Sequence, residues 1–191
     1  RYDLKHLYRL ILNSKTYQLS SRPRTDNPEG AANFAYYPLR RLDAEVLVDA
    51  LCQITGTTES YSSAIPEPFT FIPEGRRSIG LPDGSITSPF LELFGRPSRD
   101  TGLESERNNN PSPAQRLHLL NSTHVQRKIE TSPKFQFLSR SAKNPQGLVT
   151  GMYLMILSRF PTQEEQKIVA AYSLSGGVKG RDAMVDLAWA L

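Results

Sequence analysis

The side chains of this sequence that could do chemistry concentrate in one polar stretch, GRPSRDTGLESERNNNPSP, over residues 95–113. Three arginines, one aspartate and two glutamates lie within twelve residues of it, and no apolar period runs through them. They are Arg96, Arg99, Asp100, Glu104, Glu106 and Arg107. Paired carboxylates supply general acids and bases, whereas guanidinium groups bind sulfate, phosphate or carboxylate through two parallel hydrogen bonds.

Three interpretations of this stretch are open. In the first, Asp100, Glu104 and Glu106 act as catalytic acids and bases, or as oxygen ligands for Ca²⁺ or Mg²⁺. In the second, the three arginines clamp an anion. In the third, the arginines and carboxylates pair with one another and fix the stretch onto the helix that begins at Pro113. Because the two signs of charge are equal in number, we favour mutual neutralisation.

A further charged pair is predicted on a helix from about Pro38 to Ile54, which Gly56 would end. Its apolar arc consists of Leu39, Leu42, Val46, Leu47, Ala50, Leu51 and Ile54. Asp43 falls inside this arc, and a carboxylate on a buried face needs a partner. Arg40 lies three residues earlier, within reach of a helical ion pair. We expect Arg40 and Asp43 to form a structural pair.

Other catalytic and cofactor patterns are missing from the sequence. It has no P-loop, no dinucleotide-binding glycine fingerprint, no HExxH and no nucleophile elbow. The single Cys52 excludes an internal disulfide, a multi-cysteine metal site and a haem attachment motif. His118 and His124 lie six residues apart, which on one helix would place them on different sides. We therefore expect no metal site and no cofactor.

The composition is that of a globular domain. A chain of 191 residues with 38% hydrophobic and 22% charged residues can bury a real core. No apolar run approaches the roughly 20 residues of a membrane helix, so no membrane insertion is expected. The chain opens at Arg1 without an initiator methionine and closes on DLAWAL in a predicted helix. We expect an excerpt of a longer protein, so missing targeting signals carry no information.

The net charge of +4 arises largely between residues 116 and 143. Six basic side chains there are opposed only by Glu130. They are Arg116, Arg127, Lys128, Lys134, Arg140 and Lys143. Such a run could bind a polyanion or nucleic acid. No recognition-helix or RNA-binding signature accompanies it, so solvated helix faces are the favoured interpretation and nucleic acid is a disfavoured partner.

The predicted fold class is mostly α: an irregular helical domain with one long Pro/Gly-rich insert and at most a short β element. We treat 1–191 as a single domain, helical over 1–55, irregular over 56–112 and helical over 113–191. Residues 56–113 hold eight of the fourteen prolines and six of the twelve glycines. Two apolar segments, PFTFIP and SPFLELFG, are expected to anchor the insert, with FTFI as a short strand.

The helices are predicted from periodicity and start signals. Residues 4–12 repeat apolar side chains at helical spacing, and 147–160 does the same. Capping boxes are expected at SPAQ (112–115), THVQ (123–126) and TQEE (162–165). The second of these predicts two helices joined at Asn121–Ser122. A last helix begins near RDAMVDL.

Four ordered motifs resemble a known family. They are RRLDAE (40–45), SPFLELFGRPSRDTGLESERNN (88–109), AQRLHLLNS (114–122) and LSRFPTQEE (157–165). Together they are similar to the planctomycete-specific PSD-one domain, catalogued as domain of unknown function fifteen-fifty-three. The resemblance spans nearly the whole chain, which would form the C-terminal part of that domain.

The resemblance implies a large exported bacterial protein, periplasmic or on the cell surface, that carries companion domains. No activity is established for the family, so no catalytic role is carried over. Many relatives have a cysteine near the middle acidic–arginine motif, and this chain has RDTGLESER there instead. A thiol or metal role of that cysteine therefore does not apply.

We accordingly expect a non-catalytic helical binding or scaffolding domain with a charged loop network at its centre. Its expected partners are other domains of the same polypeptide, a protein or a polysaccharide. The alternative is a hydrolase of polysaccharide or sulfated glycan that uses the carboxylates and arginines of residues 96–107. Binding of a polyanion through residues 116–143 is a minor alternative.

Overall fold

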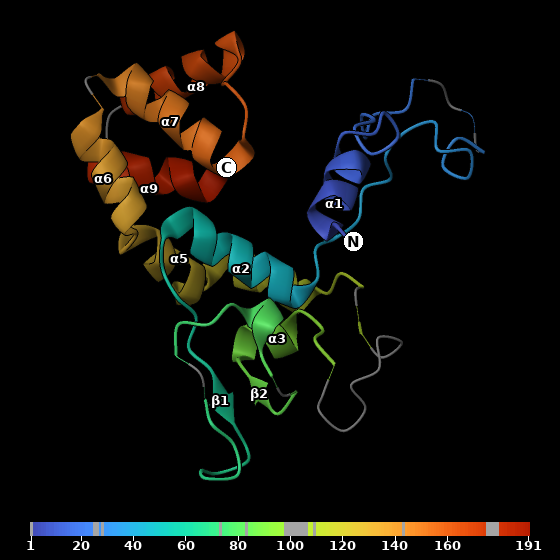
Figure 1. Ribbon diagram of the computed structural model, residues 1–191. Helices are drawn as coiled ribbons and strands as arrows, with labels where there is room; N and C mark the ends of the chain where they lie inside the picture. Colours follow the sequence, from blue (N-terminus) through green and yellow to red (C-terminus); the bar gives the residue numbers. More distant parts are fainter. Residues whose placement is uncertain are drawn as a thin grey trace. The chain divides into compact units, whose positions relative to one another are not determined.

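The computed structural model describes residues 2–24, 27, 29–72, 74–82, 84–97, 107–108, 110–142, 144–174 and 180–191. Over these residues the protein is mostly helical, with one short two-stranded ladder (Figure 1). The fold class is as predicted. The chain divides into two compact units, Arg1–Arg41 and Leu42–Leu191. The division falls inside the segment 1–55 that the sequence treats as one helical region.

The first unit contains helix α1 (Leu4–Leu12). The Asp3 carboxylate caps it by accepting a hydrogen bond of 3.0 Å from the backbone N–H of His6. The helix is as predicted from its apolar spacing. None of its residues is buried, so its apolar stripe lies at the surface of this unit.

The second unit is arranged around α2 (Ala44–Thr55). The chain continues through β1 (Ser62–Ser63), the 3₁₀ turn η1 (Ser78–Gly80), β2 (Ile86–Thr87) and α3 (Pro89–Leu93). The remaining helices are α4 (Pro113–Asn121), α5 (Thr123–Glu130), α6 (Pro133–Ser141), α7 (Pro145–Leu157), α8 (Gln163–Leu174) and α9 (Arg181–Ala190). Helix α2 packs against η1 and α3 on one side and against α5 and α6 on the other (Figure 1).

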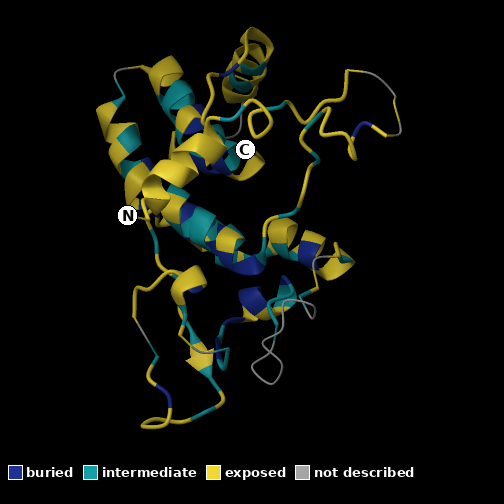
Figure 2. Ribbon diagram, turned by 45° about the vertical axis from the view of Figure 1, so that its right-hand side comes forward, coloured by how far each residue is buried: buried dark blue, intermediate teal, exposed yellow. Residues whose placement is uncertain are grey.

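Two hydrophobic clusters form the core of this unit, and α2 contributes to both. The first joins Ala44 and Val48 of α2 to Phe90, Leu91 and Phe94 at α3. Figure 2 shows buried residues where α2 and α3 face one another. Burying a side chain such as Phe90 stabilises the fold by about 2 to 3 kcal/mol.

The second cluster is built from α5, α6, α7 and α9. Its buried members are Val125, Ile129, Phe135, Met152, Met184, Val185 and Ala188. Leu51 of α2 packs against both clusters, and Ile54 packs against this one. The C-terminal helices and the insert are therefore coupled through one helix.

Helix α2 begins six residues later than predicted. Asp43 is its N-cap residue, in extended conformation with φ −62° and ψ 154°, so Pro38–Leu42 are not helical. The buried face also differs, because Val48 is fully buried while Val46 is 38% exposed. The predicted end is confirmed. Gly56 adopts a left-handed conformation with φ 74° and donates to the Cys52 carbonyl.

The insert is anchored by only one of its two apolar segments. Ser88 caps α3, Pro89 occupies its first turn, and Phe90 and Phe94 are buried. The predicted strand FTFI is wrong, since residues 69–72 form no strand and Phe69 and Phe71 are about four-fifths exposed. Thr70, which lies between the two phenylalanines, is buried instead. The ladder pairs β1 with β2 in antiparallel register, Ser63 opposite Ile86.

The predicted helix starts are confirmed at two of three capping boxes. Ser112 and Gln115 form a reciprocal box at α4, and Thr162 and Glu165 form one at α8. The remaining box, predicted at THVQ (123–126), is wrong by one residue. Ser122 ends α4 and also caps α5, because its hydroxyl accepts the Val125 N–H. Helices α4 and α5 therefore meet at a sharp break, as the sequence indicates at Asn121–Ser122.

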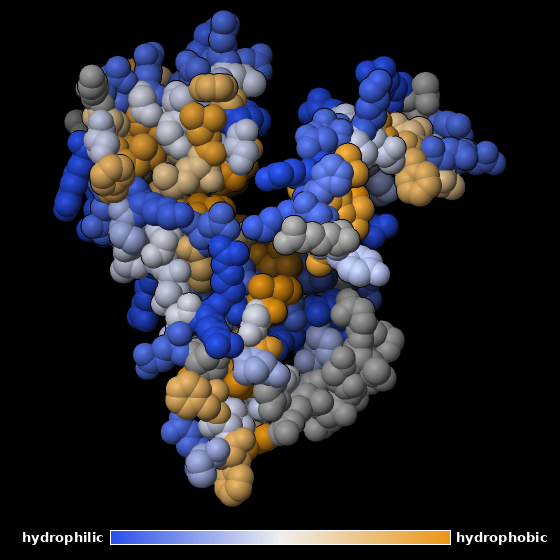
Figure 3. Space-filling view, in the orientation of Figure 1, coloured by the Kyte–Doolittle hydropathy of each residue, from blue (hydrophilic) through white to orange (hydrophobic). Residues whose placement is uncertain are grey.

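Hydrophobic side chains also occur at the surface of this unit. Figure 3 shows them interspersed with hydrophilic ones over α7 and α8. Leu154, Ile168 and Trp189 are between 41% and 67% exposed. Among the helices of the described residues, none has the length and apolarity that crossing a bilayer requires.

The two ends of the polar stretch meet at Gly95. Its φ is +90°, and its carbonyl accepts a 3.2 Å hydrogen bond from the Asn108 N–H. An added Cβ would lie 2.0 Å from the Asn108 carbonyl oxygen. Only glycine therefore permits this close approach of the two backbone segments.

We predict that Gly95→Ala lowers the free energy of unfolding by about 3 kcal/mol or more, because it adds a left-handed strain to a backbone clash. Chemical denaturation followed by circular dichroism measures the change. Gly80→Ala is the control, since nothing lies within 4 Å of its Cβ position. Equal stability of the two variants would contradict the prediction.

Candidate functional site

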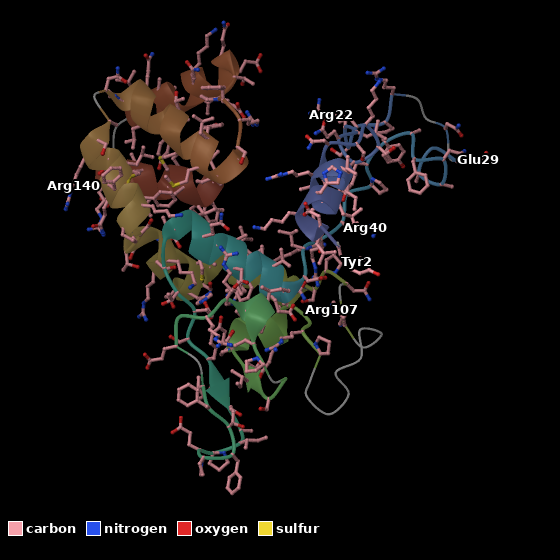
Figure 4. The ribbon with its side chains drawn as sticks, viewed as in Figure 1. Tyr2, Arg22, Glu29, Arg40, Arg107 and Arg140 are labelled. Carbon is pink, nitrogen blue, oxygen red and sulfur yellow. The ribbon has the colours of Figure 1, made fainter. Side chains whose placement is uncertain are left out.

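Two arginines of the polar stretch converge on Glu45, near the start of α2. Arg107 makes a two-pronged contact with the Glu45 carboxylate, at 2.7 Å and 3.2 Å. The Nε of Arg96 lies 3.4 Å from the same carboxylate. The three side chains are only 8% to 12% exposed. We call these three residues the Glu45 node, and Figure 4 shows Arg107 beside the N-terminal end of α2.

Glu45 is positioned by the true start of the helix. It occupies the first turn of α2, where the unpaired backbone N–H groups favour negative charge. Burial raises the pKa of its carboxyl, but the hydrogen bond and charge of Arg107 and the charge of Arg96 outweigh burial. The pKa therefore lies below its ordinary value, and the carboxylate is ionised at neutral pH.

Arg96 also ties the node to the ladder. Its guanidinium donates to the carbonyl of Ile86 in β2, and its backbone N–H donates to Leu91 of α3 at 3.0 Å. Gln115 of α4 makes a parallel connection, with its amide donating 2.9 Å to the Leu93 carbonyl. The node thus connects α2, α3 and β2 through charged groups beneath the surface.

The structure brings together part of the predicted network. Arg96 and Arg107 share one carboxylate, although this carboxylate is Glu45 and not an acid of the stretch itself. Arg99, Asp100, Glu104 and Glu106 lie outside the described residues. Their predicted pairing or catalytic use stays a prediction.

The basis for the Arg40–Asp43 pair is removed by the late start of α2. The pair was predicted from helical spacing, and Arg40 is not helical while Asp43 is the N-cap residue. Glu45 was not predicted, because a helix that starts at Pro38 places Asp43 and not Glu45 on the apolar face. The available signal was Asp43 itself, which is a preferred N-cap residue two positions before Glu45.

A second buried charged cluster lies at the other end of α2. Glu59 accepts hydrogen bonds from Nε2 of His124 and from Nζ of Lys128, each at 2.9 Å. Lys128 also donates to the Thr58 carbonyl at 2.8 Å and approaches Sγ of Cys52 at 3.3 Å. The side chains of Glu59 and Lys128 are 7% and 8% exposed. We call these residues the Glu59 cluster.

This cluster corrects one interpretation of the basic run. Lys128 lies on no solvated face, because its ammonium group neutralises Glu59 inside the protein. Arg116, Arg127 and Arg140 are exposed as expected, and Lys143 lies outside the described residues. The polyanion alternative over 116–143 stays a prediction.

The break between α4 and α5 brings two histidines together. The rings of His118 and His124 lie 5.7 Å apart, and both contact Phe90. The expectation of separated rings fails because it assumed one continuous helix. Burial lowers the pKa of His118, and the charge of His124 lowers it further, so His118 is neutral at pH 7.

The charges of the Glu59 cluster neutralise one another, although Nδ1 of His124 is buried without a hydrogen-bond partner among the described residues. Burial raises the pKa of the Cys52 thiol, which therefore stays protonated at neutral pH and is a weak nucleophile. Burial also opposes ionisation of Glu59, but the hydrogen bonds and charges of His124 and Lys128 hold its pKa below the ordinary value. Within the part of the chain that is described, no group of three or more His, Cys, Asp or Glu residues is arranged to hold a metal.

We predict that the protein loses stability as the pH falls below about 4.5, the ordinary carboxyl value. The pKa values of Glu45 and Glu59 are lowered by folding, so their stabilisation is present above that value and is lost as each carboxylate is protonated. Glu59→Gln should flatten the dependence of unfolding free energy on pH, measured by urea denaturation between pH 7 and 3. The exposed Glu92→Gln should keep the parental slope; indistinguishable variants would refute the assignment.

Comparison with known proteins identifies the family of this chain. No curated protein and no solved structure shows significant similarity to the chain. A family model described as "Protein of unknown function (DUF1553)", PSD1, matches residues 1–173. This range includes the Glu45 node, the Glu59 cluster and the four motifs RRLDAE to LSRFPTQEE. The chain therefore belongs to the DUF1553 family.

Proposed function

We propose that this chain is a non-catalytic helical domain that binds or scaffolds within a large exported bacterial multidomain protein. The observation that carries the proposal is the convergence of Arg96 and Arg107 on the buried Glu45. A general acid or base must keep a carboxylate available to substrate, and this carboxylate is occupied by two guanidinium groups. The charged side chains of the stretch that the structure describes, Arg96 and Arg107, stabilise the fold.

The Glu59 cluster supports the same proposal. Its carboxylate is neutralised by Lys128, and the Cys52 thiol is kept protonated by burial. A nucleophile activated by an adjacent base would instead need a lowered pKa and a free base beside it. Export and companion domains enter the proposal from the family resemblance, and the partners proposed are those domains, a protein or a polysaccharide.

We predict that Glu45→Gln lowers the free energy of unfolding by about 3 kcal/mol or more, because it removes the buried negative charge that the guanidinium groups of Arg96 and Arg107 share. The matched control is Glu165→Gln, which alters the more exposed pair of Arg159 and Glu165 and should lower the stability much less, because solvent screens this pair. Both are measured by chemical denaturation at pH 7. A Glu45→Gln variant as stable as the control would remove the structural role of the node.

The absence of catalysis is tested with acidic and sulfated polysaccharides. We expect the migration of the parent protein to be retarded in gels that contain such a polymer. We expect no new reducing ends to form on the polymer. Triple replacement of Asp100, Glu104 and Glu106 by the matching amides is the control and should bind equally. Reducing ends that form with the parent and vanish with the triple variant would overturn the proposal and establish the hydrolase.

A further inference from the structure

A pocket of about 330 Å³ lies at the C-terminal end of α2. It is lined by the last two turns of the helix, by residues 57–59 and Tyr61, by residues 75–77 and by Lys134. The volume is at the lower end of the range for small-molecule sites and suits a ligand the size of one sugar ring. The Glu59 cluster forms part of its wall through Cys52 and Glu59.

Most charged groups at this pocket are already engaged. The Asp49 carboxylate accepts the backbone N–H groups of Ser78 at 2.7 Å and Ile79 at 3.1 Å. Glu59 is neutralised by Lys128. Nζ of Lys134 donates to the carbonyl of Gln53 and so covers the negative end of α2.

Two guanidinium groups are left over. Arg76 and Arg77 both line the pocket, and neither side chain has a hydrogen bond or ion pair among the described residues. Both are exposed. The two carboxylates of the wall, Asp49 and Glu59, already have partners. The arginine pair therefore gives the pocket a positive charge that no carboxylate of the wall neutralises.

The backbone that carries the two arginines is fixed on both sides. The Tyr61 hydroxyl lies 2.9 Å from the Arg76 carbonyl oxygen and 2.9 Å from the Ser78 hydroxyl. Ser78 is 1% exposed, and Asp49 holds its N–H. The backbone at the arginine pair is therefore held by the fold before a ligand binds, so binding has to order only the two side chains.

We propose that this pocket binds a saccharide-sized molecule bearing an oxyanion, either a carboxylate or a sulfate. The oxyanion lies at Arg76 and Arg77, whose planar guanidinium groups match both anions through paired hydrogen bonds. The hydroxyls of the sugar contact Gln53 and Thr58, which line the same pocket. The inference gives a ligand class to the binding role proposed above, at a site separate from the Glu45 node.

The test is titration of the protein with glucuronate, glucose 6-sulfate and glucose, followed by calorimetry. We expect saturable binding of at least one acidic sugar and none of glucose. Arg76→Gln/Arg77→Gln should weaken the binding at least about tenfold, the equivalent of one charged hydrogen bond. Arg116→Gln/Arg140→Gln removes the same charge from exposed helix faces and should bind as the parent does; Figure 4 shows Arg140 projecting outward from α6.

The outcomes separate the two anions and the two proposals. Binding of glucuronate alone assigns a carboxylate site, and binding of glucose 6-sulfate alone assigns a sulfate site. The inference is overturned if neither acid saturates, if glucose binds as tightly, or if both double variants weaken binding equally. Such a result would leave the Glu45 node intact, whereas polysaccharide hydrolysis would overturn the non-catalytic role and leave acid-sugar binding in place.

Discussion

A buried carboxylate that is shared by two arginines is the constraint on which the second unit of this protein depends. An ionised Glu45 below the surface is tolerable only with countercharges and hydrogen bonds in place. Those come from Arg96 and Arg107, the first and last charged residues of the polar stretch. The electrostatic requirement of one residue in α2 therefore determines where a segment more than forty residues later must lie.

Helix α2 has a comparable role at its other end. Asp49 fixes η1, Leu51 packs against both hydrophobic clusters, and the Thr55 carbonyl accepts the Ser132 hydroxyl of the next helical region. These contacts are long-range in sequence, so α2 is stabilised by tertiary packing as well as by local propensity. Among the described residues, α2 thus makes polar contacts with the insert, through Glu45 and Asp49, and with the C-terminal helices, through Thr55.

Local signals in the sequence were sufficient for much of the fold. Capping at Ser112, the end of α2 at Gly56 and the break at Ser122 all depend on residues close in the chain, and these features were predicted to within a residue. Errors arose where tertiary contacts decide. Phe69 and Phe71 alternate as in a strand but have no neighbouring strand, and the start of α2 is moved by the extended conformation at Asp43.

The site was predictable in its arginines but not in its acid. The concentration of charged residues between Arg96 and Arg107 is visible in the sequence. Their shared partner Glu45, which lies 51 and 62 residues earlier, is not. The same limit applies to the Glu59 cluster, because Lys128 looks like one member of a basic run until the fold places it beside Glu59. The spacing of residues in the sequence predicts which side chains are neighbours on one helix. These pairs join separate helices and loops, so spacing does not predict them.

The hydrogen bond between Gly95 and Asn108 has an evolutionary consequence. Since the chain leaves and rejoins the core at one point, the intervening connection can change in length without moving α3 or α4. In general, doubling the length of a connection between two fixed points costs only about 0.6 kcal/mol in closure entropy. Insertions should therefore be tolerated between Arg96 and Arg107 with little effect on folding, as long as both arginines are kept.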